Sequence, residues 1–143
     1  MKRRQTLMRA VGRTHRAWQS HVRKLTVAEG IPDSYRTVLL FLHRHPGSPQ
    51  RAIAEFANVT TSAINQTVKT MLEEGYINKE PDPADKRNNR LFLTEKGDEV
   101  AQRLYGKLDA SDDAITAMIG EEREKELIGF LETLADYIRK DLP

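Results

Sequence analysis

Apolar residues recur at three-, four- or seven-residue spacing along most of the 143-residue chain, and only one stretch shows a different, strand-like pattern. Such spacing puts apolar side chains on one face of a helix. The predicted helices cover about 6–28, 33–45, 49–57, 60–74 and 94–119, with a last one after Gly120. The interruption holds two short strand-like runs, Tyr76–Lys79 and Arg90–Leu93, separated by turn-forming residues. The sequence therefore predicts a mainly α-helical fold with one two-stranded β-hairpin.

Residues that favour helix ends separate the predicted helices. Ser48 is a suitable N-cap for the third helix, with Pro49 in its first turn. Asn58 tolerates the left-handed conformation that ends a helix sharply, and Thr60 or Thr61 can cap the helix that follows. Two short helices joined by a tight turn and followed by a hairpin predict a winged helix-turn-helix lobe with a two-stranded β wing.

The second helix of this pair has an outward face of small polar residues and one lysine. In helix-turn-helix proteins this helix enters the major groove and its N-terminal half contacts base edges. Asn and Gln can bind adenine through two hydrogen bonds, Thr can contact a thymine methyl group, and Lys can reach guanine or phosphate. The predicted DNA contacts of this helix are Thr60, Thr61, Ser62, Asn65, Gln66 and Lys69. The alternative is an ordinary solvated helix face.

Basic residues also cluster in and beside the turn between the two strands. An arginine at the tip of a protruding loop can enter the minor groove, where narrow A·T-rich DNA concentrates negative potential. Asp85 could hold the guanidinium of Arg87, because a carboxylate accepts hydrogen bonds from the arginine fork. The predicted wing contacts are Lys79, Asp85, Lys86, Arg87, Asn88, Asn89 and Arg90. The alternative is a charged surface loop.

Charge is divided unevenly along the chain. Residues 1–93 contain 16 Lys and Arg against 8 Asp and Glu, whereas residues 94–143 contain 7 against 13. A basic front and an acidic back suit a protein that contacts a polyanion with one part only. We therefore expect double-stranded DNA as a partner.

The segment from Gly30 to Gly97 resembles the MarR-type (multiple antibiotic resistance) regulators. Their second helix and its Pro-Gly exit resemble GIPDSYRTVLLFLHRHPG, and their helix-turn-helix resembles SPQRAIAEFANVTTSAINQTVKTMLEEGYI. Their wing and the start of their fifth helix resemble PDPADKRNNRLFLTEKG, which is the most specific of the three strings. Two residues depart from the family pattern: Asn58 replaces the glycine usual in the turn, and Arg36 stands where an aromatic residue is common.

The resemblance implies a triangular homodimer with its interface on the first, fifth and sixth helices. It implies recognition of a pseudo-palindrome, usually for repression near the regulator's own promoter. It also implies that Arg87 is the wing-tip residue of the minor groove, with Asp85 as its orienting partner. A small-molecule pocket between the dimer helices and the DNA-binding lobe is a further implication.

The terminal helices carry long apolar stripes that a lobe of residues 32–93 cannot cover, so we expect them to bury against a second subunit. Two-fold pairing would place the recognition helices about 34–36 Å apart, which is one turn of DNA. The predicted dimer-interface residues are Leu7, Val11, Trp18, Leu127, Leu131, Leu134 and Ile138. The alternative is that these stripes pack within the chain.

A basic residue within an apolar stripe indicates a site for a small aromatic or anionic effector. Arg36 and two histidines could hold such a ligand, for example an aromatic carboxylate. The candidate ligand-binding residues are His15, Trp18, Tyr35, Arg36 and His43. The alternative is that Trp18 and Tyr35 belong to the core and that Arg36 pairs with a carboxylate.

Several functions find no support in the sequence. The chain has no cysteine, and its four histidines lack a ligand constellation, so we expect no metal and no cofactor. It has no Gly-rich phosphate loop, nucleophile elbow or HExxH motif, so we do not expect an enzyme. A secretory signal and an apolar run of about 18 residues are missing, which favours a cytoplasmic protein without a membrane span.

Together these patterns predict three segments: an N-terminal dimerisation helix (1–29), a DNA-binding lobe (30–97) and C-terminal dimerisation helices (98–143). The predicted function is a ligand-responsive homodimeric repressor that reads a pseudo-palindromic operator. One alternative is a winged helix that binds a protein partner, in which the face of Thr61, Asn65 and Lys69 would be idle. The other is a small enzyme, which the lack of clustered catalytic residue types disfavours.

Overall fold

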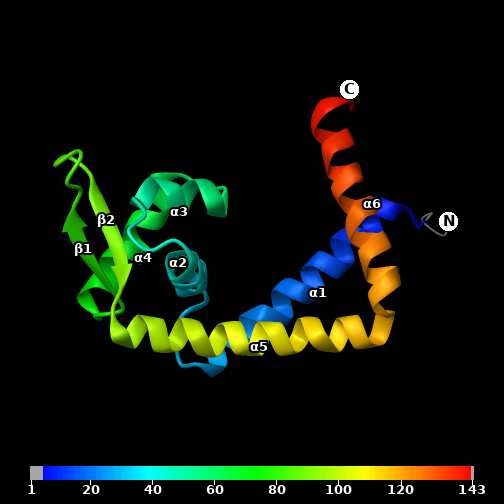
Figure 1. Ribbon diagram of the computed structural model, residues 1–143, viewed down its shortest axis with the longest axis horizontal. Helices are drawn as coiled ribbons and strands as arrows, with labels where there is room; N and C mark the ends of the chain where they lie inside the picture. Colours follow the sequence, from blue (N-terminus) through cyan, green and yellow to red (C-terminus); the bar gives the residue numbers. More distant parts are fainter. Residues whose placement is uncertain (1–4, 143) are drawn as a thin grey trace. The chain divides into compact units, whose positions relative to one another are not determined.

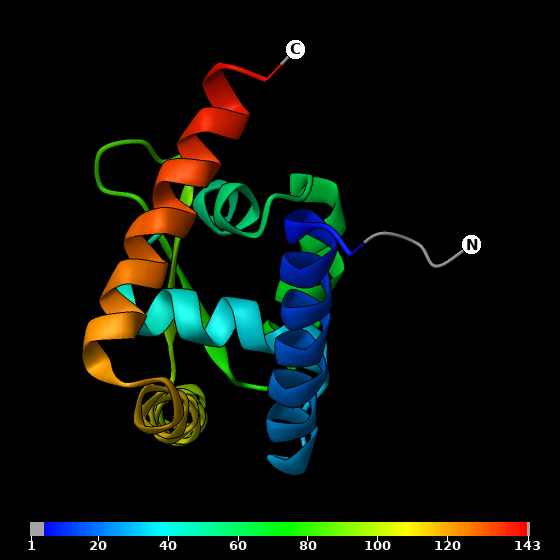
Figure 2. The same cartoon turned by 90° about the vertical axis from the view of Figure 1, so that its right-hand side faces the viewer.

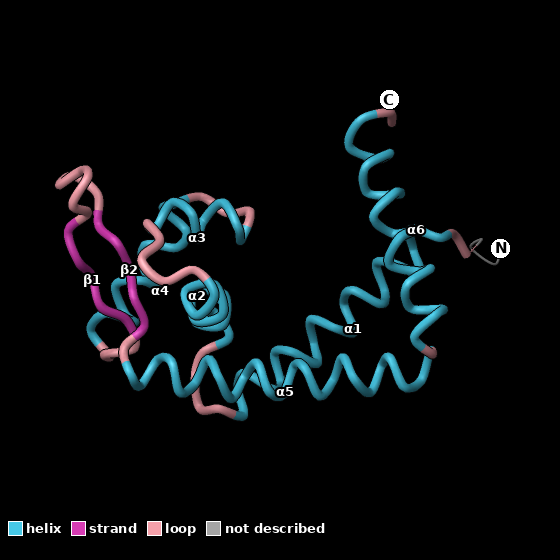
Figure 3. The backbone as a smooth tube through the Cα atoms, in the orientation of Figure 1, coloured by secondary structure: helices cyan, strands magenta, loops and turns pink. Residues whose placement is uncertain are grey.

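The computed structural model describes residues 5–142, which form helices and one hairpin in the order predicted. The helices are α1 (Leu7–Ala28), α2 (Asp33–Arg44), α3 (Gln50–Ala57), α4 (Thr61–Glu73), α5 (Glu95–Ile119) and α6 (Glu121–Lys140), and the strands are β1 (Ile77–Pro81) and β2 (Asn89–Leu93) (Figure 1). The mainly α-helical, winged fold is therefore confirmed, with its only strands among the described residues drawn in magenta in Figure 3. The predicted segment 1–29 begins with four residues, 1–4, that lie outside the described residues.

The chain divides into two compact units, the first ending at Gly106 and the second beginning at Lys107. Helix α5 therefore starts in the first unit and ends in the second. The second unit also contains α6, which follows Gly120, a glycine with a φ of 92°. There the Thr116 hydroxyl donates to Glu124 Oε1 over 2.7 Å and links the two helices across that glycine. The wing and the helix-turn-helix lie wholly in the first unit.

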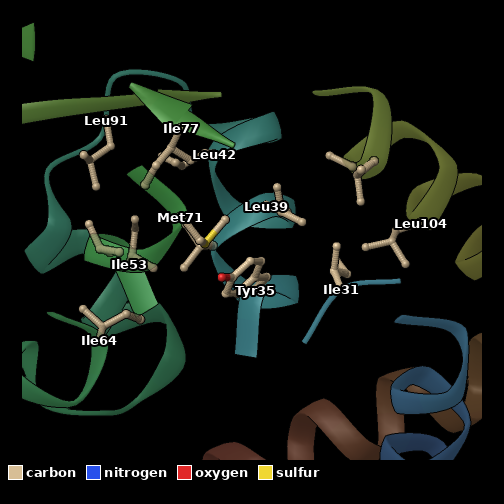
Figure 4. Packing of buried hydrophobic residues seen from close by; sticks show 14 of the residues in the cluster. Ile31, Tyr35, Leu39, Leu42, Ile53, Ile64, Met71, Ile77, Leu91 and Leu104 are labelled. Atoms are coloured by element: carbon tan, nitrogen blue, oxygen red, sulfur yellow. The ribbon is translucent and has the colours of Figure 1, made fainter. Parts of the chain in front are cut away.

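One apolar cluster holds the first unit together (Figure 4). Leu39 of α2, Ile53 of α3 and Met71 of α4 are fully buried within it. Ile77 and Leu91 bring the two strands of the hairpin into the same cluster. Burial of each such side chain contributes about 1.5–3 kcal/mol, so this core fixes the helix pair α3–α4 relative to the base of the wing.

Helix α2 crosses the first part of α5 steeply: Figure 1 shows α2 end-on and α5 lengthwise, and Figure 2 shows the reverse. Two polar contacts join them. His43 Nδ1 lies 2.7 Å from Asp98 Oδ1, and the Tyr105 hydroxyl donates to the backbone oxygen of Leu40 over 2.9 Å. These contacts connect α2 to the first three turns of α5.

The helix ends confirm two predictions and correct one. Asn58 has the left-handed conformation, with φ of 54° and ψ of 45°, and Thr60 caps α4 by accepting from the Ala63 amide at 3.1 Å. Ser48, however, is not the N-cap of α3, because that position belongs to Pro49. The Ser48 hydroxyl instead donates to the backbone oxygen of His45, and its own backbone oxygen accepts from Leu91 at 3.0 Å. The prediction failed because the pairing of Ser48 with Leu91 of the wing joins residues far apart in the sequence, and local capping preferences do not reveal such a contact.

The hairpin is longer than the predicted runs at the end nearer its tip. Its register pairs Ile77 with Leu93 at the base and Pro81 with Asn89 at the far end. The predicted strands stopped at Lys79 and began at Arg90. Proline has no amide hydrogen to donate to a neighbouring strand. Pro81 is tolerated here because, within residues 5–142, the sheet has only the strands β1 and β2, so β1 is an edge strand.

Candidate nucleic-acid interface

Helix α4 turns one face to the core and leaves the other open. Ile64, Val68 and Met71 are its buried residues. Their spacing leaves the intervening positions outward, as helical periodicity requires. Each residue predicted as a DNA contact of this helix is exposed: Thr60, Thr61, Ser62, Asn65, Gln66 and Lys69. The placement agrees with the predicted outward face of this helix.

The wing places most of its predicted contacts in solvent as well. Its exposed members are Lys79, Asp85, Lys86, Arg87, Asn88 and Asn89. Arg90 differs, because it is only partly exposed and its Nε donates to the backbone oxygen of Gly47 over 3.2 Å. Its guanidinium also lies 5.3 Å from the centre of the Phe92 ring. In this arrangement Arg90 anchors the wing to the α2–α3 loop.

Asp85 shapes the wing tip in a way that differs from the prediction. One carboxylate oxygen accepts from the backbone amide of Arg87 at 3.0 Å, and the other accepts from Asn88 Nδ2 at 3.2 Å. Within residues 5–142, no ion pair joins Asp85 to the Arg87 guanidinium. Asp85 therefore holds the backbone of the tip and leaves the guanidinium of Arg87 free to extend.

A groove of about 710 Å³ lies between helix α4 and the wing. It brings together predicted contacts from both elements, namely Thr61, Asn65, Lys69, Lys79, Arg87, Asn88 and Asn89. Its other polar lining residues were not singled out from the sequence, and these are Gln50, Arg51 and Asp82. Asp82 accepts from the Ala84 amide at 2.9 Å and belongs to the loop framework.

Gln50 and Arg51 were missed although a local signal was present. Both lie in the first turn of α3, and the N-terminus of a helix favours phosphate groups. Arg51 adds a fourth cation to the groove beside Lys69, Lys79 and Arg87, against the single carboxylate of Asp82. A phosphate-rich ligand would therefore meet a positive lining on both sides of the groove.

Four of the five candidate effector residues each have a hydrogen-bond or ring partner of their own. The fifth, His15, is exposed. Arg36 pairs with Asp33, as the alternative interpretation held, and Trp18 lies beside the ring of His21 at 5.7 Å. Neither the groove nor a second hollow, which is lined by α1 residues, includes any of the five. The structure therefore does not bring them together around either hollow.

Tyr35 is 3% exposed, and its hydroxyl donates to Glu74 Oε2 over 2.8 Å. Burial, reinforced by this hydrogen bond, raises the pKa of Tyr35 to about 12. The folded protein therefore keeps this proton at pH values where the unfolded chain, with a pKa of 10.0, has lost it. This hydroxyl links α2 to the C-cap of α4.

This pKa predicts a loss of stability in alkaline solution. The contribution of Tyr35 is complete below pH 10 and declines as the pH rises towards 12, by roughly 2–3 kcal/mol in total. The Tyr35→Phe variant, which has no hydroxyl to titrate, should show a shallower decline over this range. Urea unfolding of both proteins at a series of pH values measures the difference. Parallel curves would contradict the prediction.

Among the described residues there is no group of three or more His, Asp, Glu or Cys side chains that could bind a metal ion. Nor does any helix within residues 5–142 have the length and apolar character needed to cross a membrane.

Comparisons with known proteins agree with this geometry. A model of the MarR family matches residues 29–88. The HTH-type transcriptional regulator BilQ of Clostridium symbiosum is 26% identical over 106 residues, which cover 74% of each chain. The solved structure of the transcriptional regulator SlyA superimposes with a TM-score of 0.80 at 22% identity and covers 96% of both chains. The chain is similar to MarR-family regulators in sequence and in fold. It is therefore a DNA-binding transcription regulator and not an enzyme.

A further MarR-like structure is that of the transcriptional repressor CouR bound to a 23-mer DNA duplex. It has a TM-score of 0.76 and 24% identity, and it covers 91% of this chain and 92% of its own. At this identity the similarity establishes the fold alone. The MarR-family match covers α2, α3, α4 and the wing up to Asn88, and it includes every residue that lines the groove except Asn89 and Leu91.

Proposed function

We propose that this MarR-family regulator is a homodimeric repressor in the cytoplasm that reads a pseudo-palindromic operator. Helix α4 would enter the major groove, where Asn65 and Gln66 read bases, and Arg87 of the wing would enter the minor groove. The observation that carries this proposal is the groove, which joins the polar face of α4 to the basic wing. An ordinary exposed polar face of α4 would not explain why cations of the wing lie beside it.

The segment boundaries of the proposal follow from this assignment. The lobe 30–97 binds DNA, and the segments 1–29 and 98–143 bring two subunits together. Support comes from the apolar residues that the chain leaves exposed on the terminal helices: Leu7 is 49% exposed and Leu131 is 44% exposed. The remaining predicted interface residues lie on the same two helices, and these are Val11, Trp18, Leu127, Leu134 and Ile138.

The function is tested by fluorescence anisotropy with a labelled DNA fragment from upstream of the protein's own gene. A scrambled fragment of the same length serves as control, and both are titrated over a series of salt concentrations. We expect preferential binding to the upstream fragment with a steep salt dependence, because each phosphate contact releases counterions. Equal and weak binding to both fragments, and to fragments selected from the whole genome, would contradict sequence-specific regulation and favour a protein partner for the winged helix.

The Arg87→Ala variant gives a residue-level prediction. Its affinity for the preferred fragment should fall, and the slope of log K against log salt should become shallower by about one unit per subunit. Arg23→Ala is the matched control, because it removes the same charge from an exposed position of α1 that does not line the groove. An unchanged slope for Arg87→Ala, or an equal change for Arg23→Ala, would remove Arg87 from the set of DNA contacts.

The proposal also includes a small aromatic or anionic effector that lowers the affinity for DNA. Support comes from Arg36, a cation of α2 that is 15% exposed and that an anionic ligand could draw away from Asp33. Isothermal calorimetry with salicylate-like acids should show binding heat, and the same acids should weaken binding in the anisotropy assay. No heat and an unchanged affinity for DNA would contradict an effector of this class.

A further inference from the structure

Two amide side chains meet across the helix-turn-helix. Gln50, the first residue of α3, donates from its Nε2 to Oδ1 of Asn65 on α4. Both residues line the groove between α4 and the wing. Asn65 is one of the residues to which base reading is assigned in the proposed function, whereas Gln50 has no assigned role.

The position from which Gln50 acts is firmly held. Its helix is short, but Ile53 and Ala54 bury it in the core at 0% and 2% exposure. The residue two places before Gln50 is Ser48, whose backbone oxygen accepts from Leu91 of the wing at 3.0 Å. Gln50 therefore extends from a backbone that is fixed on both sides, which allows it to orient a neighbouring side chain.

The hydrogen bond ties the orientation of the Asn65 amide to that of the Gln50 amide. An asparagine amide offers one oxygen with two lone pairs and one NH₂ group with two donors. Since Gln50 donates to one lone pair of Oδ1, a flip of the Asn65 amide alone would place NH₂ against NH₂ and lose the bond. The orientation that remains presents Nδ2 as a donor and the second lone pair of Oδ1 as an acceptor. Adenine offers the matching pair in the major groove, N7 as acceptor and N6 as donor.

We propose that Gln50 is a positioning residue that orients Asn65 for adenine, so that each half-site carries an adenine at the position Asn65 contacts. This inference rests on the proposed function, because it assumes that α4 lies in the major groove. Gln50 need not touch the base. Its effect is to disfavour a flip of the Asn65 amide on its own, in which the oxygen and nitrogen would exchange places and a different base would fit.

The experiment selects bound DNA from a library of random-sequence duplexes and sequences the bound pool. The proteins compared are the full-length wild type, Asn65→Ala, Gln50→Met and Gln66→Met. Met preserves the length of Gln and removes its hydrogen-bonding groups. Gln66→Met is the matched control, because Gln66 lies on α4 and its Nε2 donates weakly, over 3.4 Å, to Thr70 of its own helix. Thermal unfolding confirms that the variants are folded.

We expect the wild-type pool to contain an adenine whose enrichment disappears with Asn65→Ala. Gln50→Met should lower the enrichment of the same adenine about fivefold, the effect of losing one ordinary hydrogen bond, and leave the other positions unchanged. Gln66→Met should affect a different position. Unchanged adenine enrichment with Gln50→Met, or an equal loss at all positions, would overturn the inference.

Gln50→Glu provides a second test that does not depend on loss of a contact. Its carboxylate can only accept, so the Asn65 amide should turn, donate to Glu and present its oxygen to the base. The preferred base should then change from adenine towards one that offers a donor, such as cytosine with its N4 amino group. Retained adenine preference would overturn the inference. A wild-type pool with no enriched motif would instead contradict the proposed sequence-specific function itself.

Discussion

Replacement of Gly97 by alanine is expected to lower the free energy of unfolding by at least about 3 kcal/mol. Gly97 is buried in the first turn of α5, where a Cβ atom would lie 2.1 Å from the backbone oxygen of Tyr76. That oxygen already accepts from the Thr94 amide at 3.1 Å, at the junction of the wing and α5. The backbone must move apart to accept the methyl group, so the base of the wing should shift and DNA affinity should fall as well.

The same helix supplies the control for this prediction. A Cβ atom on Gly106, also in α5, has no atom within 4 Å. Gly106→Ala should therefore be neutral or raise stability by up to about 1 kcal/mol, because alanine favours the helix more than glycine does. Urea unfolding of the two variants beside the wild type measures both effects. Equal stabilities for the two variants would contradict the close approach at Gly97.

The Leu131→Glu variant is expected to convert the proposed dimer into monomers and to weaken operator binding by about a hundredfold or more. None of the residues of α6, all of which the structure describes in full, is buried. Leu127, Leu131, Leu134 and Ile138 nevertheless form one apolar stripe by helical spacing. A carboxylate in the middle of a dimer interface would lose its hydration without a partner. A monomer can occupy only one half-site at a time, so it loses the gain from linked binding.

Lys125→Gln is the matched control for Leu131→Glu. It also lowers the net charge by one, but helical periodicity puts Lys125 on the opposite side of α6, where its side chain is 73% exposed. It removes only a surface pair with Glu122, which contributes little to stability. Analytical ultracentrifugation and anisotropy measure the two variants. A dimeric Leu131→Glu protein, or an equal loss with Lys125→Gln, would contradict the assignment of this face to the dimer.

Local signals in the sequence predicted the elements and several of their ends. Asn58 and Thr60 ended one helix and began the next as expected, because left-handed tolerance and side-chain capping act within three residues of the chain. The exposed face of α4 was also predicted, since apolar spacing alone decides which side chains face the core. These features depend on neighbours in the sequence and need no knowledge of the rest of the fold.

Contacts between distant residues could not be predicted in this way. Ser48 looked like a helix cap, yet its backbone pairs with Leu91, more than forty positions further along the chain. Arg90 looked like a free wing cation, yet its Nε donates to Gly47. One local expectation also differed: Asp85 was expected to hold the guanidinium of Arg87, but its carboxylate accepts from the backbone amide of Arg87 instead.

The sequence by itself determined the order of helices and strands, the polar face of the recognition helix and the basic character of the wing. Periodicity, capping and charge are properties of short segments, and the resemblance of residues 30–97 to one family rests on the same segments. The tertiary structure alone decided which of these residues share a groove, and that Gln50 holds the amide of Asn65. Such pairings arise only when burial of the common core brings separate helices and the wing to fixed distances, because hydrogen bonds between side chains require separations of about 3 Å that sequence spacing does not encode.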